Sequence, residues 1–85
     1  MVNLDMMNAL TTAADLLHRR RVGLDNINRY IDSWLTYPGW TSSQIGMFNL
    51  IRKEESAAVV IAALNMLAAE VTYQHAKSIW ESLKQ

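Results

Sequence analysis

Residues 57–69 read AAVVIAALNMLAA and are the most apolar stretch of the chain. A helix over this stretch is apolar on every side for more than three turns, and such a helix is normally buried all round. Neighbouring helices from a chain of 85 residues can cover about two of its faces. We therefore expect another copy or another protein to cover the remainder. Alternatively, the small alanine side chains expose little apolar area, and the monomer is stable without a partner on this helix.

The remainder of the chain also has the pattern of helices. Apolar residues recur three and four positions apart almost everywhere, and no strand-like alternation is sustained. The pattern predicts an all-α protein, a small antiparallel bundle of three to four helices. With 85 residues we expect one domain, 1–85.

Local signals place the helix ends. The first helix is predicted over 3–21, with Gly23 supplying a left-handed terminus, and the second from an Asp25 cap to a stop before Pro38. Residues 41–44 (TSSQ) match a capping box that opens the third helix. The polar run 52–56 predicts a break, because one helix over 41–83 would be about 65 Å long. Ser56 then caps a fourth helix over 57–83.

Composition excludes several classes of function. The chain has no cysteine, which removes disulfides and thiolate metal sites and is typical of a reducing compartment, so we expect a cytoplasmic protein. Eight basic and eight acidic residues cancel, so no overall charge attracts nucleic acid or anionic lipid. The thirteen apolar residues 57–69 are fewer than the about 20 that a bilayer requires, and no secretory signal is visible at the N-terminus. We expect no membrane insertion.

No residue pattern indicates catalysis. His18 and His75 each lack a second ligand one turn away, so they are expected to be packed residues and not metal ligands. The carboxylates are dispersed, and neither a phosphate-binding loop nor a nucleophile elbow is present. The sequence predicts no enzyme, no metal and no cofactor.

The apolar fourth helix and the aromatic residues favour binding. Val60, Leu64 and Leu67 are the expected contacts to a partner helix, and Asn65 is a polar residue that could select register. Trp34 and Trp40 are candidate aromatic anchors. These features predict a protein-interaction module, of the regulator, inhibitor or chaperone and adaptor type, that binds a partner protein or itself.

A cluster of arginines supports an alternative. Arg19, Arg20, Arg21 and Arg29 form a local basic patch, and helix–turn–helix proteins have this size. The alternative function is a small DNA-associated transcriptional or nucleoid regulator. The neutral net charge makes nucleic acid the less favoured partner.

Overall fold

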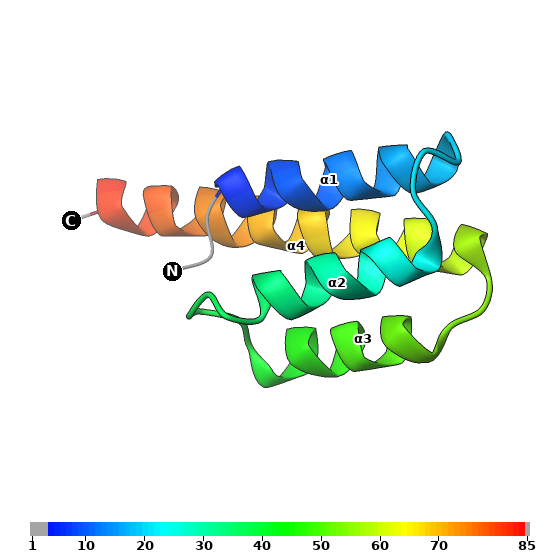
Figure 1. Ribbon diagram of the computed structural model, residues 1–85. Coiled ribbons are helices and arrows are strands. Elements are labelled where there is room, and N and C mark those ends of the chain that lie inside the picture. Colours follow the sequence, from blue (N-terminus) through cyan, green and yellow to red (C-terminus); the bar gives the residue numbers. More distant parts are fainter. Residues whose placement is uncertain (1–3, 85) are drawn as a thin grey trace.

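The structure, a computed structural model, describes residues 4–84 and consists over that range of four helices without strands. They are α1 (Leu4–His18), α2 (Leu24–Trp34), α3 (Ser42–Lys53) and α4 (Ala57–Leu83). The chain reverses direction at each connection (Figure 1). The predicted all-α small bundle is confirmed.

The predicted start signals of α3 and α4 are confirmed. The Thr41 hydroxyl accepts a hydrogen bond from the backbone N–H of Gln44, and the Gln44 side chain accepts one from the backbone N–H of Thr41. This reciprocal pair is the capping box. The Ser56 hydroxyl accepts from the N–H of Val59, so Ser56 caps α4 as predicted. The predicted break in the run 52–56 is also present: α3 ends at Lys53, and α4 begins at Ala57.

The end of α1 differs from the prediction. The helix ends at His18, so the arginines at 19–21 follow it and are not in its last turn. The predicted start of this helix, Asn3, lies outside the described residues. Arg20 has φ 58° and adopts the left-handed conformation that we expected of Gly23. The N–H of Arg21 donates to the carbonyl of Leu16, which is the bond of a Schellman terminus.

The start of α2 differs as well. Gly23 is extended, with φ −101° and ψ 178°, and is the N-cap of α2 without a side-chain hydrogen bond. Asp25, the predicted cap, lies inside the first turn. A carboxylate in the first turn still stabilises a helix, because it faces the positive end of the helix dipole.

The core is formed mainly between α1 and α4, the pair with the most extensive contact, with α2 and α3 packed against it. The core side chains are mostly aliphatic, with two aromatic residues, Trp34 and Phe48, among them. The large apolar side chains that are fully buried are Leu10, Ile27, Ile31, Phe48, Val60, Leu64, Leu67 and Val71.

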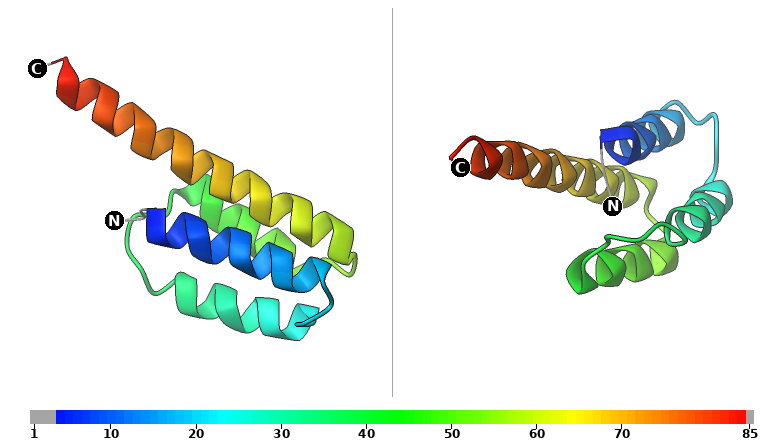
Figure 2. Two further views of the ribbon diagram at one scale, coloured as in Figure 1. Left: turned by 90° about the horizontal axis from the view of Figure 1, so that it is seen from above. Right: turned by 90° about the vertical axis from the view of Figure 1, so that its left-hand side faces the viewer.

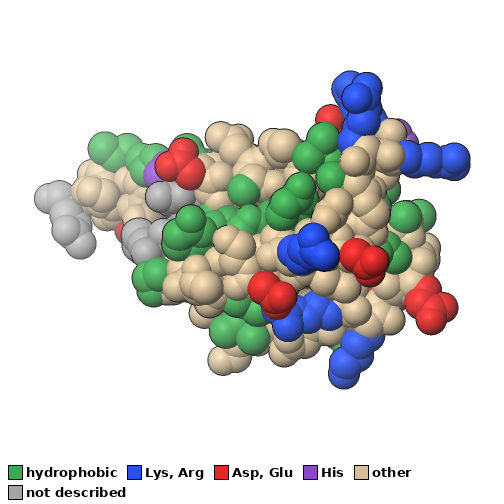
Figure 3. Space-filling model, viewed as in Figure 1, with side chains coloured by type: hydrophobic (Ala, Val, Ile, Leu, Met, Phe, Trp, Pro, Cys, Tyr) green, Lys and Arg blue, Asp and Glu red, His purple; other side chains and the backbone are tan. Residues whose placement is uncertain are grey.

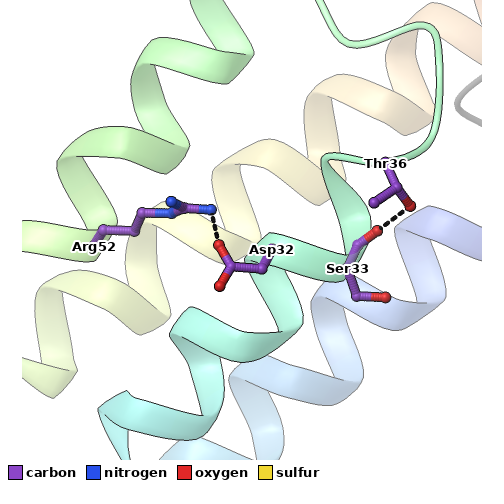
Figure 4. Close-up of polar contacts among 4 residues, drawn as sticks. All are labelled: Asp32, Ser33, Thr36 and Arg52. Carbon is purple, nitrogen blue, oxygen red and sulfur yellow. Dashed lines mark hydrogen bonds and ion pairs between the residues drawn. The ribbon is translucent and has the colours of Figure 1, made fainter.

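Polar and aromatic contacts hold α2 and α3 together as a pair. The indole N–H of Trp40 donates to the carbonyl of Trp34 at 2.8 Å, and the Trp40 ring meets Phe48 edge-on with centroids 4.9 Å apart. Figure 4 shows a further contact between the two helices, the ion pair of Arg52 of α3 with Asp32 of α2. It also shows a local hydrogen bond at the end of α2, in which the Thr36 hydroxyl donates to the carbonyl of Ser33.

The C-terminal half of α4 extends beyond the other helices (Figure 2). With 27 residues, α4 is about 40 Å long, whereas the 15 residues of α1 cover about 22 Å. Every residue from 72 to 84 is exposed. Within residues 4–84, this part of the helix therefore has no buried side chain.

Candidate interaction surface on α4

One face of α4 is apolar and exposed along its whole length. The residues on this face are separated alternately by three and four positions, the spacing that two helices need to pack along one another. We name them the exposed stripe: Val59, Ala62, Met66, Ala69, Tyr73, Ala76, Trp80 and Leu83.

The opposite face of α4 carries a second apolar row with the same spacing. It consists of Val60, Leu64, Leu67 and Val71, each 2 % exposed or less. The stretch 57–69 is thus apolar all round because it has two apolar faces. One packs in the core of this chain, and the other faces solvent.

This arrangement corrects the predicted contact residues. Val60, Leu64 and Leu67 were expected to meet a partner helix, but they lie in the core of this chain and are inaccessible to one. The sequence could not separate the two faces, because both are apolar over 57–69. Asn65 is exposed beside the stripe, where it lines a cavity with residues of α1, including Asp15 and His18.

The two predicted aromatic anchors belong to the structural framework. Trp34 is buried, and Trp40 is half-buried and hydrogen-bonded to Trp34 across the α2–α3 connection. Three aromatic side chains, Tyr37, Tyr73 and Trp80, are more than half exposed; the last two lie on the exposed stripe, and the sequence reasoning missed them. The signal that could have found them is the spacing of the stripe, which continues past Ala69 to Leu83.

Charged residues line one side of the exposed stripe. Glu70, Lys77 and Lys84 each follow a stripe residue directly and are spaced by seven. The side-chain amide of Gln44, a buried residue, donates to the Glu70 carboxylate at 3.1 Å and so connects α3 to α4 beside the stripe. The Lys84 ammonium lies 5.3 Å from the centre of the Trp80 ring. A negative charge therefore borders the middle of the stripe and positive charges its C-terminal part.

The histidines and arginines do not form a joint site. His18 and His75 are exposed, so the expectation that they are packed is wrong, and no group of three His, Asp or Glu side chains in residues 4–84 could hold a metal ion. Arg19 pairs with Asp15 at 3.1 Å. Lys and Arg side chains gather at the end of the molecule near the α1–α2 connection (Figure 3), where Arg20 and Arg21 are exposed.

Two further features border the stripe. A cavity of about 360 Å³ between α3 and α4 is lined by Leu50, Val59 and Ala63 among others, and so adjoins the N-terminal end of the stripe. By length and composition alone, α4 is long and apolar enough to cross a membrane, a criterion that core helices of soluble proteins also meet.

Comparison with protein-family models, curated proteins and solved structures finds no match for this chain.

Proposed function

We propose that this protein is a small cytoplasmic protein-interaction module that binds an apolar helix along the exposed stripe of α4. The carrying observation is that eight apolar residues in helix-packing spacing are all exposed over a helix of 27 residues. Exposed apolar surface of this extent marks an interaction site or an aggregation hazard on a small protein. No catalytic, metal or cofactor role is part of this proposal.

The other face of α4 favours a protein partner over a bilayer. Membrane insertion would withdraw Val60 and Leu64 from the core, where both are fully buried. It would also place Glu70 in hydrocarbon, since a spanning segment of about 20 residues that begins at Ala57 includes it, at a cost of about 2.5–3.5 kcal/mol for a charge near the centre. A partner helix on the stripe needs neither change. Flotation of the protein with vesicles under native conditions would instead indicate a membrane surface.

Photo-crosslinking in cells tests the proposal. A photoreactive amino acid replaces Tyr73 in the stripe, and the control is the same replacement at Ser78, which is exposed. Ser78 is about 200° round the helix from both Ala76 and Trp80, so it faces away from the stripe. We expect a protein adduct from position 73 and none from position 78. Equal adducts from both positions, or none from either, would contradict the proposal.

The arginine patch supports the second candidate, a DNA-associated regulator. Arg19, Arg20, Arg21 and Arg29 are all exposed, but Arg19 is paired with Asp15. The few remaining cations can neutralise few phosphates, and such binding weakens steeply with salt. A sequence-dependent mobility shift at about 150 mM salt, lost when Arg20 and Arg21 are replaced by alanine, would favour this second function.

A further inference from the structure

We propose that the helix bound by the exposed stripe is α4 of a second copy of this chain, lying antiparallel, with the midpoint of the pair between residues 74 and 75. This inference rests on the proposed function and specifies its partner. Three observations carry it: the alternation of large and small residues in the stripe, the charges beside it, and the apolar area that it exposes.

Residue size in the stripe strictly alternates as far as Trp80. The first residue of each seven is large and the fourth is alanine: Val59, Met66, Tyr73 and Trp80 against Ala62, Ala69 and Ala76. In a parallel pair, equivalent positions face each other, so layers of two aromatic rings would alternate with layers of two alanines. In the antiparallel pair proposed here, Tyr73 and Trp80 each face an alanine, so the four central layers have similar volume, and a layer of Met66 with Leu83 closes each end. Even filling of layers is the condition for close packing.

The flanking charges select one register of the antiparallel pair. When Tyr73 faces the partner's Ala76, Trp80 faces the partner's Ala69 and Glu70 lies beside the partner's Lys77. Two-fold symmetry forms that opposite-charge pair twice. A shift by one heptad in one direction brings Glu70 beside its own copy, and a shift in the other direction brings Lys77 beside its own copy. The first shift juxtaposes two like charges and forms no opposite-charge pair, which disfavours it. The second shift places Glu70 beside the partner's Lys84, but it also places the two Lys77 side chains together and removes the layers of Met66 with Leu83, so it buries less apolar surface.

The exposed area is sufficient for a reversible dimer. Tyr73 is 67 % and Trp80 is 60 % exposed. An aromatic side chain can bury 150–250 Å², so these two rings contribute roughly 200–300 Å² for each copy. Met66 and Leu83, which face each other in this register, are both more than half exposed and add a similar amount. The total over both copies is on the order of 1,000 Å², near the lower limit of specific interfaces.

The fold leaves this pairing free of obstruction. Residues 72–84 project beyond α1, α2 and α3, as Figure 2 shows, so no helix of the same chain covers them. In the proposed register, the projecting segment of one copy lies along residues 65–77 of the other. The two bundles then lie at opposite ends of the helix pair.

Disulfide trapping tests orientation and register, and the absence of cysteine from the chain removes background. Chains carrying Met66→Cys are mixed with chains carrying Leu83→Cys under mild oxidation. A disulfide requires Cα atoms within about 7 Å, so the antiparallel register gives a crosslink between the two different chains. Disulfides within each variant, 66 to 66 and 83 to 83, would overturn the proposal in favour of a parallel pair. Ser82→Cys replaces Leu83→Cys as the control and should not crosslink.

Light scattering on the purified protein tests self-association itself. We expect a mass that rises with concentration toward twice 9.7 kDa. Trp80→Glu should return it to the monomer, whereas Ser78→Glu, on the opposite face, should leave the dimer intact. A native chain that stays monomeric up to about 200 µM overturns this inference. If Tyr73 nevertheless crosslinks to a different protein in cells, the proposed function stands and only the identity of its partner changes.

Discussion

Leu64 and Met66 lie two residues apart on α4, and their substitution by alanine tests which face of that helix forms the core. Leu64 is 0 % exposed, and Leu64→Ala should cost about 2–5 kcal/mol of unfolding free energy. A chain of 85 residues has about 4–13 kcal/mol in total. Met66 is 62 % exposed, so Met66→Ala should change the stability of the monomer by less than about 0.5 kcal/mol. Alanine is also the best helix former.

Thermal unfolding followed by circular dichroism at 222 nm measures both variants. A loss of about 3 kcal/mol lowers the Tm of a domain of this size by about 12–24 °C. Low protein concentration removes any contribution of association, and a second series at high concentration restores it. We expect Met66→Ala to lower the Tm only in the second series. An equal loss for Leu64→Ala and Met66→Ala in dilute solution would refute the assignment of the two faces.

Three further substitutions examine separate parts of the structure. Gln44→Ala removes the hydrogen bonds to Thr41 and Glu70 and should cost about 1–2 kcal/mol in urea unfolding, and an unchanged midpoint would contradict the roles given to this side chain. Arg20→Gly relieves a left-handed backbone and should stabilise the protein by about 0.5–1 kcal/mol, so a lower Tm would count against that conformation. Ending the chain after Thr72 removes residues 73–84, whose side chains are exposed. Helicity per residue should drop slightly, and the Tm in dilute solution should change by only a few degrees. Loss of the folded state would show that this segment stabilises the monomer.

Local chemistry determined the helices and most of their ends from the sequence alone. The Thr41 and Gln44 capping box, the Ser56 cap and the stop before Pro38 each depend on residues within one turn of the helix end. Such signals act over short distances along the chain, so they can be read without knowledge of the fold. The end of α1 was missed because a left-handed terminus, usually a glycine, falls here on Arg20.

Only the tertiary structure decided which face of α4 meets the chain and which meets solvent. Over 57–69 both faces are apolar, so the amino-acid pattern assigns neither to the core. The choice depends on how α1, α2 and α3 together cover the helix, and they reach only as far as Val71. Beyond Val71 the exposed stripe continues with the same seven-residue spacing, and its residues Tyr73 and Trp80 are exposed to solvent. Burial is a sum over contacts from distant parts of the chain, and a helix with two apolar faces therefore acquires an inside and an outside only when the fold forms.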